Sequence, residues 1–202
     1  MLVNQFIFVN RDGRRFIRED APRSALSEAV LAQPGRHAFT VIDFRGFRAL
    51  SPLMQKEAVL AIESGDAWAD GSLSQLARKM GVPPGHLQTT VEAYNRGVSA
   101  RRDPLGKSLH GLALPLSEPP FWACYAGMSV HYTLGGIRIS PRAEALDAAR
   151  SPIPGLWAAG EAAGGVHGVN RLGGSGINDA LIFGRIAGRA AAGLDSHGLG
   201  PA

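Results

Sequence analysis

Apolar residues recur at helical spacing along the first half of the chain and again near its end. This periodicity predicts helices over residues 24–32, 52–64 and 73–80, one after Pro83-Pro84 that runs to about residue 98, and one over 177–192. The helix over 73–80 has the clearest bounds, because Ser72 is a typical N-cap and Gly81 a typical stop. The final helix is rich in alanine and glycine, which permits close packing on a sheet.

Short apolar runs between these helices predict strands. An opening hairpin is expected over residues 5–18, because two such runs flank Asp12-Gly13, a strong turn signal. Further strands are expected over residues 38–42, 122–125, 128–132, 137–139 and 156–159, the last of them short and buried. Residues 101–120 are rich in glycine, proline and serine and are expected to connect two units. Mixed helices and strands place the chain in the α+β or α/β class.

Composition excludes several classes of function. With 45% hydrophobic and 19% charged residues among 202, the chain can bury a core. The net charge of +4 comes mostly from scattered arginines, whereas a nucleic-acid surface needs a dense basic stripe. No segment is long enough to cross a membrane, so we expect a soluble protein, with the cytoplasm as the favoured compartment.

Cysteine and histidine usage predicts neither a disulfide nor a metal site. Cys124 is the only cysteine and cannot form an internal disulfide. His37, His86, His110 and His197 lack the mutual spacing, and the cysteine or aspartate partners, of a metal centre. We therefore predict that the chain binds no metal.

The most informative segment runs from Gly155 to Gly176. Here a short apolar strand is followed by a glycine-dense turn that carries Arg171, and then by the last helix. Glycines let the backbone approach a cofactor closely, and the N–H groups at a helix start favour negative charge. Because reduced flavin develops negative charge on its pyrimidine edge, a flavin suits this turn.

Several stretches together resemble the FAD-dependent fumarate reductase and succinate dehydrogenase flavoprotein family. They follow the family's order and span nearly the whole chain, from about Val9 to about Gly193. The stretches are Val9–Phe16, Ala21-Pro22-Arg23-Ser24, His131-Tyr132-Thr133-Leu134-Gly135-Gly136, and Gly160-Glu161 with His167–Gly174. The resemblance implies an α+β cap domain over residues 1–118 and, over 119–202, the C-terminal lobe of a Rossmann-like FAD-binding domain. It also implies hydride transfer between flavin N5 and the C=C or C–C bond of a small carboxylic acid.

The resemblance implies roles for individual residues. Arg171 would clamp a substrate carboxylate beside the flavin, His131 would hold the other end of a dicarboxylate, and Arg23 would deliver a proton to the substrate carbon. Ser24 stands where the family has an aspartate, which changes what can hold Arg23. The residues implied to line the flavin are Gly160, Glu161, Asn170, Gly173, Gly174, Ser175, Gly176 and Ile177.

Structural alternatives stay open for these residues. Arg171 could pair with Asp179, and His131 could be an ordinary strand histidine. Glu161 could be a solvated loop acid, and His167 could only shape the turn. Arg23 could equally be a solvent-exposed residue at the start of a helix.

The family's N-terminal dinucleotide-binding part is absent, because no G-x-G-x-x-G turn opens the chain. The upstream histidine and the Thr-Glu-x-x-Arg cluster are also missing. We therefore expect the C-terminal half of a flavoenzyme that binds FAD weakly or not at all by itself. The acid stays open, with fumarate as the default and urocanate-like or aspartate-like acids compatible.

Two alternatives belong to other classes. The chain could be a non-catalytic fragment that binds no FAD, or one subunit of a split flavoenzyme whose partner supplies the missing half. An isolated fragment should expose apolar surface where the missing half packs, and should tend to self-associate.

Overall fold

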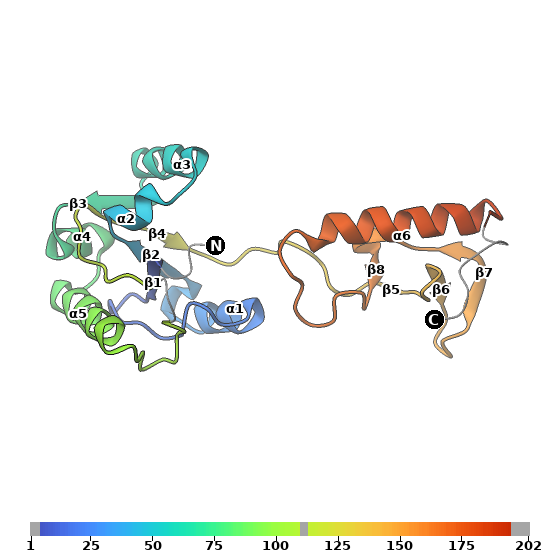
Figure 1. The fold of residues 1–202 in the computed structure, drawn as a ribbon, viewed down its shortest axis with the longest axis horizontal. Coiled ribbons are helices and arrows are strands. Elements are labelled where there is room, and N and C mark those ends of the chain that lie inside the picture. Colours follow the sequence, from blue (N-terminus) through green and yellow to red (C-terminus); the bar gives the residue numbers. More distant parts are fainter. Residues whose placement is uncertain (1–4, 110–112, 195–202) are drawn as a thin grey trace. The chain divides into compact units, whose positions relative to one another are not determined.

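The computed structural model describes residues 5–109 and 113–194. The chain forms two compact units, Met1–Met128 and Ser129–Ala202. Figure 1 labels the helices and strands of both.

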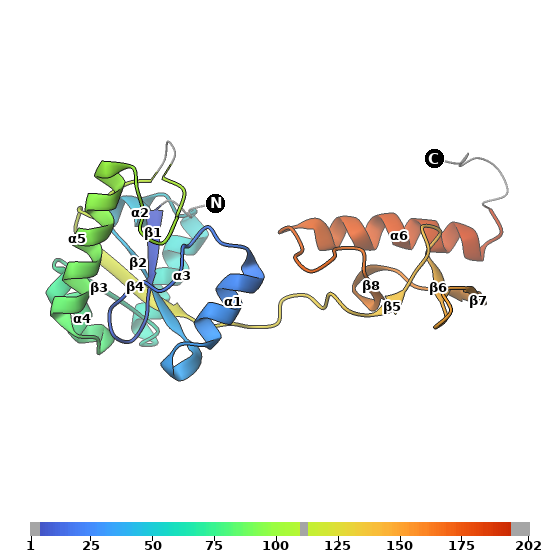
Figure 2. The same ribbon diagram turned by 90° about the horizontal axis from the view of Figure 1, so that it is seen from below.

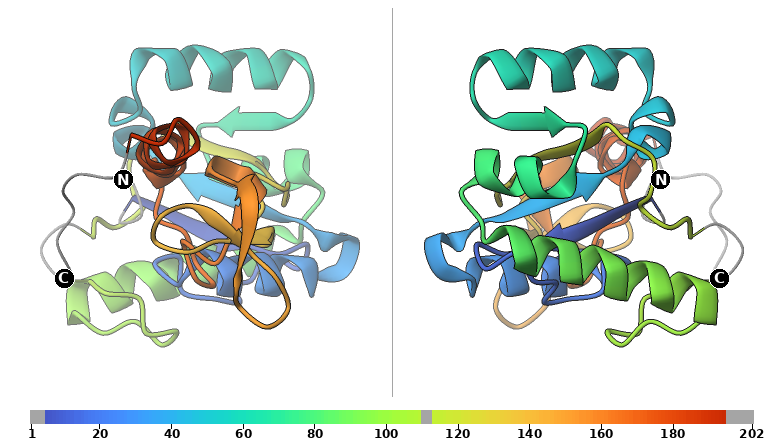
Figure 3. Two further views of the ribbon diagram at one scale, coloured as in Figure 1. Left: turned by 90° about the vertical axis from the view of Figure 1, so that its right-hand side faces the viewer. Right: turned by 90° about the vertical axis from the view of Figure 1, so that its left-hand side faces the viewer.

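The first unit is built on a four-stranded antiparallel sheet with the strand order β1-β2-β4-β3. Alternation along the strands buries Ile7 and Val9 of β1, and Phe39 and Val41 of β2, on one face of the sheet. Two helices cover this face and complete the hydrophobic core, as the right-hand view of Figure 3 shows. These elements are β1 (Phe6–Val9), β2 (Ala38–Ile42), β3 (Ala67–Asp70), β4 (Phe121–Ala126), α4 (Leu73–Met80) and α5 (Pro84–Ala100).

The other helices of this unit are α1 (Arg23–Leu31), α2 (Phe44–Arg48) and α3 (Pro52–Glu63), with a short 3-10 turn, η2 (Pro34–Arg36). All helices predicted for this region are present, with ends that differ by a residue or two. At α4 the predicted bounds hold because Ser72 Oγ accepts the N–H of Gln75 at 3.2 Å, and Gly81 ends the helix with a left-handed φ of 71°. Helix α2 and strand β3 had not been predicted.

The opening hairpin predicted over residues 5–18 is wrong in its pairing. The turn itself forms, with the N–H of Gly13 donating to the carbonyl of Asn10 at 2.9 Å. However, β1 pairs with β2, and residues 14–18 form no strand. The reason is that Arg15 binds the buried carboxylates of Glu19, at 2.7 Å, and Asp103, at 2.5 Å. These ion pairs hold the stretch after the turn in an irregular loop.

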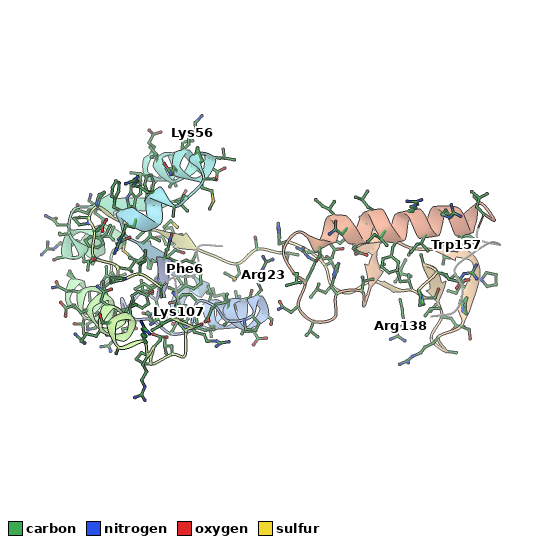
Figure 4. The ribbon with its side chains drawn as sticks, viewed as in Figure 1. Phe6, Arg23, Lys56, Lys107, Arg138 and Trp157 are labelled. Carbon is green, nitrogen blue, oxygen red and sulfur yellow. The ribbon has the colours of Figure 1, made fainter. Side chains whose placement is uncertain are left out.

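A buried cluster of four charged residues joins this loop to the segment that follows α5. Its members, Arg15, Glu19, Asp103 and Lys107, have side chains no more than 7% exposed. Lys107 Nζ lies 3.1 Å from Glu19 Oε2 and donates to the carbonyl of Phe6 at 2.7 Å (Figure 4). Burial lowers the pKa of Lys107, although the charge of Glu19 opposes this. Part of the predicted connection over residues 101–120 is thereby anchored to the first unit.

Strand β4 decides where the first unit ends. It pairs with β2 along one edge and with β3 along the other, so it lies inside the sheet. The first compact unit therefore ends at Met128, whereas the cap was expected to end at residue 118; the assignment of a cap stays a prediction.

The second unit combines short strands with one long helix. β5 (Ile137–Arg138) pairs in parallel with β8 (Ala163–Gly164), and β6 (Glu144–Leu146) pairs antiparallel with β7 (Pro152–Trp157). The 3-10 helix η3 (Gly160–Ala162) packs against α6 (Ser175–Ala191). Figures 1 and 2 both show α6 running alongside the strands.

Two predicted strands of this region differ in the structure. Residues 128–132 form no strand, because Tyr132 and the next residue direct hydrogen bonds to the carboxylates of Asp179 and Glu161. The strand expected over 156–159 is the end of β7, and Leu156 is 44% exposed rather than buried. Its exposure follows from pairing: β7 has only β6 beside it among the described residues.

Within residues 5–109 and 113–194, no group of histidine, cysteine, aspartate and glutamate side chains is arranged to hold a metal ion. In the same ranges, no helix combines the length and the apolar character that a membrane span requires. His110 and His197 lie outside the described residues.

Candidate functional site

The N-terminus of α6 is open at its backbone. Gly174, the residue before the helix, has a left-handed φ of 85°, and no side chain caps the helix. Ser175 turns back instead: its N–H and its hydroxyl both donate to the carbonyl of Leu172, at 3.3 and 2.7 Å. Without a capping side chain, the positive end of the helix dipole remains available to an anionic group.

The start of α6 also lies against an aromatic ring. A Cβ atom on Gly176 would lie 2.7 Å from Cε2 of Tyr132, so only glycine fits at this position. Gly176, one of the glycines predicted to bring the backbone close to a planar cofactor, thus brings it close to the Tyr132 ring.

Arg171 comes three residues before Gly174 and stacks on the same ring. Its guanidinium carbon lies 4.4 Å from the centroid of the Tyr132 ring, which is a cation–π contact. Its Nη1 donates to the carbonyl of Leu172 at 3.0 Å, and its Nε is buried and has no partner among the described residues. It does not pair with Asp179, the alternative open from sequence, whose Oδ2 binds other donors. Its Nη2 makes no hydrogen bond within the described part of the chain and is a donor that remains for an external carboxylate.

Asp179, in the second turn of α6, binds two aromatic side chains at once. It is 4% exposed, and its Oδ2 accepts the hydroxyl of Tyr132 at 2.8 Å and lies 3.2 Å from Nε2 of His167. Desolvation, and then the hydrogen bond and charge of Asp179, raise the pKa of Tyr132. His167 therefore anchors its glycine-rich turn to α6.

Glu161 ties a second pair of segments together. Its Oε1 accepts the N–H of Thr133 at 2.6 Å, so the acid of η3 holds the loop that carries His131. Although its side chain is exposed, this bond gives Glu161 a defined structural role.

The structure brings together only some of the predicted site residues. In the second unit, Arg171, Glu161 and the start of α6 converge on the 131–136 loop through the contacts given above. His131 and Asn170 are exposed, and neither makes a hydrogen bond within the described part of the chain. Arg23 is exposed at the first residue of α1, in the first unit (Figure 4).

Sequence reasoning missed the part played by Tyr132 and considered Asp179 only as a partner for Arg171. One signal was present: Asp179 is the only acidic residue in α6. A single carboxylate in a helix that is otherwise small, apolar or basic is a candidate for a specific partner.

Comparison with known proteins identifies the family. Residues 5–177 match the FAD binding domain family, so the chain belongs to that family, and FAD is its cofactor. The chain is 39% identical over 189 residues to a fumarate reductase (cytochrome) of Shewanella frigidimarina, covering 94% of this chain and 31% of that protein. It is 32% identical over 195 residues to the urocanate reductase of Eggerthella lenta, covering 96% of this chain and 32% of that protein.

A solved structure agrees. The open conformation of a flavocytochrome c3 fumarate reductase superimposes with a TM-score of 0.70 at 35% identity, covering 97% of this chain and 34% of that one. The resemblance seen in the motifs is thus confirmed for the family and its mixed helix and strand fold. The chain spans about a third of the length of these relatives.

Proposed function

We propose that this chain is the C-terminal portion of an FAD-dependent reductase acting on the C=C bond of a small carboxylic acid. The observation that carries the proposal is Arg171. Its guanidinium lies over the Tyr132 ring near the open start of α6, and no described carboxylate binds its Nη groups. A planar fork fixed in this way can bind a carboxylate through two charge-assisted hydrogen bonds.

The residues around the start of α6 fit the flavin end of FAD. The uncapped helix start favours the negative charge of the pyrimidine edge, and a Cβ atom at Gly174 would meet nothing within 4 Å, so the backbone is open at that residue. When bound, FAD supplies the hydride chemistry. The residues that would hold it are Gly160, Glu161, Asn170, Gly173, Gly174, Ser175, Gly176 and Ile177.

The substrate roles follow from charge. His131 and Arg171 would hold the two carboxylates of a diacid, and Arg23 would deliver a proton to the substrate carbon. A guanidinium is a poor acid, and a position at a helix start opposes its charge by only about 0.3–1 kcal/mol. Arg23 would therefore also stabilise the negative charge that develops on the substrate. Residues 1–118 would act as the cap that closes over the site and excludes water.

The proposal is tested by adding the N-terminal part of a relative, which this chain does not span. The chain, FAD and a separately produced N-terminal part of the Shewanella fumarate reductase are combined, and fumarate-dependent oxidation of a reduced viologen dye is followed. We expect activity with the native chain and a KM for fumarate raised at least about tenfold by Arg171→Lys, which keeps the charge but loses the fork.

Arg185→Lys is the matched control, because Arg185 is an exposed arginine of α6. It should leave KM unchanged. Equal kinetics for Arg171→Lys and the native chain would refute the role of Arg171. Absence of turnover with fumarate, urocanate and acrylate would refute the proposed reaction.

One observation also supports the split-subunit alternative. Val169, Leu172, Ile177 and Leu181 are between 68% and 88% exposed. Large apolar side chains exposed together mark a surface that binds another protein part. We propose that the N-terminal half, from the same gene or as a separate chain, covers this surface. A non-catalytic fragment would instead bind neither that half nor FAD.

A further inference from the structure

The two segments proposed to bind substrate converge on a single carboxylate. The loop over residues 131–136 carries His131 and contributes the hydroxyl of Tyr132; the turn over 164–174 carries Arg171 and contributes Nε2 of His167. Both groups reach the same oxygen of Asp179, at 2.8 and 3.2 Å.

Asp179 is linked to each proposed substrate residue through one intermediate group. Tyr132 follows His131 in the chain, and its ring carries the guanidinium of Arg171 at 4.4 Å. A shift of this ring would therefore move the support of Arg171 and the backbone of His131 together. The bond from Thr133 to Glu161 holds the loop at one further point.

Stability alone does not account for a carboxylate at this place. Asp179 is nearly fully buried, and its Oδ1 has no hydrogen-bond partner among the described residues. A buried polar atom without a partner is unfavourable, and a buried ion pair often adds little net stability. The specific gain is a fixed position for the two donors that share Oδ2.

We propose that Asp179 is a positioning residue that sets the location of Arg171 and of His131 through Tyr132 and His167. The inference rests on the proposed function, because it assigns these two residues to substrate. Asp179 itself does not touch the substrate. It fixes the ring against which Arg171 stacks and the loop that carries His131.

The experiment uses Asp179→Asn in the full chain, which keeps the shape and removes the charge. Phenolate absorbance is titrated with base. The contribution of Tyr132 among the three tyrosines is identified by comparison with Tyr132→Phe. The charged groups that face this phenol are Asp179, Glu161 and Arg171, with His167 beside it. We expect Tyr132 to titrate at lower pH in Asp179→Asn, because the carboxylate no longer opposes phenolate formation.

Positioning is then read directly by NMR, from the guanidinium resonances of Arg171 and the ring resonances of His131. We expect both sets to shift in Asp179→Asn and in Tyr132→Phe. Neither should shift in Asp147→Asn, a control in the exposed β6–β7 turn. The Tyr132→Phe variant keeps the buried carboxylate, so it still tests the link if Asp179→Asn fails to fold. Shifts confined to Tyr132 and His167 would overturn the proposal, as would no shift at all.

In the complemented enzyme, we expect Asp179→Asn to raise KM for fumarate between about tenfold and about a hundredfold, as misplaced binding groups do. An unchanged KM would count against the proposal. If the native chain shows no turnover, the proposed function fails, whereas the titration and the resonances still decide the role of Asp179.

Discussion

Tyr94 has a hydroxyl in the core of the first unit that finds no partner among the described residues. Two cations lie near its ring, with Arg15 at 5.1 Å and Lys107 at 5.2 Å from the ring centroid. Burial, and then the charge of Glu19, raise the pKa of Tyr94 to about 12. The residue stabilises the fold through its ring, while its hydroxyl makes the fold sensitive to base.

Tyr94→Phe should therefore resist alkaline unfolding better than the native chain. Below pH 10 the phenol is protonated in both the folded and the unfolded state. Between about pH 10 and about pH 12 the unfolded chain loses this proton and the folded chain keeps it, so the native fold loses up to about 2 kcal/mol of stability. The measurement is the free energy of unfolding in urea from pH 8 to 12. Parallel curves for the two proteins would contradict the prediction.

Arg171 shows what a single residue reveals in sequence and what it does not. The motif His167-Gly168 before it and Gly173-Gly174 after it led to the prediction that Arg171 clamps a carboxylate, and this role stays a prediction. The ring beneath it could not be predicted, because Tyr132 lies far away in the chain and approaches through its bond to Asp179, 47 residues further on. Side-chain contacts of this kind depend on tertiary packing, which leaves no periodic signal.

At the scale of elements, the buried cluster of Arg15, Glu19, Asp103 and Lys107 connects segments that are not paired with one another in the sheet. Glu19 accepts the N–H of Phe8 at 3.0 Å, pairs with Arg15 and approaches Lys107 at 3.1 Å. It thereby links β1, the loop before α1 and the segment after α5. The same loop leads into α1, which begins at Arg23. The cluster therefore also fixes the segment that carries the proposed proton donor.

Glu19→Gln should destabilise the first unit by about 3–5 kcal/mol, because it leaves two buried cations with one carboxylate fewer. Urea unfolding at pH 7 measures this. Glu28→Gln, on an exposed position of α1, is the matched control and should change the free energy of unfolding by less than about 0.5 kcal/mol. A loss below about 1 kcal/mol for Glu19→Gln would show that the cluster is not the link described.

Elements with a strong local pattern were predictable, and the others were not. β2 has its predicted bounds, and α4 has its predicted cap and stop. α2 was missed because five residues are too few to show helical periodicity, and its start depends on Asp43 accepting the N–H of Gly46 at 3.1 Å. The hairpin failed because β1 has its true partner about thirty residues further along the chain, while Arg15 is held by distant carboxylates.

At the scale of the whole molecule, we propose that the chain carries one end of a cofactor site. Its family takes FAD, and it spans about a third of its relatives. The start of α6 is uncapped and is the part proposed to bind the flavin ring, whereas the described residues contain no glycine-rich dinucleotide turn that opens a βαβ unit. Contacts to the pyrophosphate and the adenosine would then come from the N-terminal half. The same half would also bury the apolar side chains that are exposed on α6.

The most direct measurement is a titration of the purified chain with FAD, following the quenching of flavin fluorescence, with and without the N-terminal part of the Shewanella relative. Arg171→Ala serves as the control for the site. We predict weak binding to the chain alone, lost on gel filtration, and retained FAD when both parts are present. Tight binding to the chain alone would contradict the account, because the chain would then hold a complete dinucleotide site of its own.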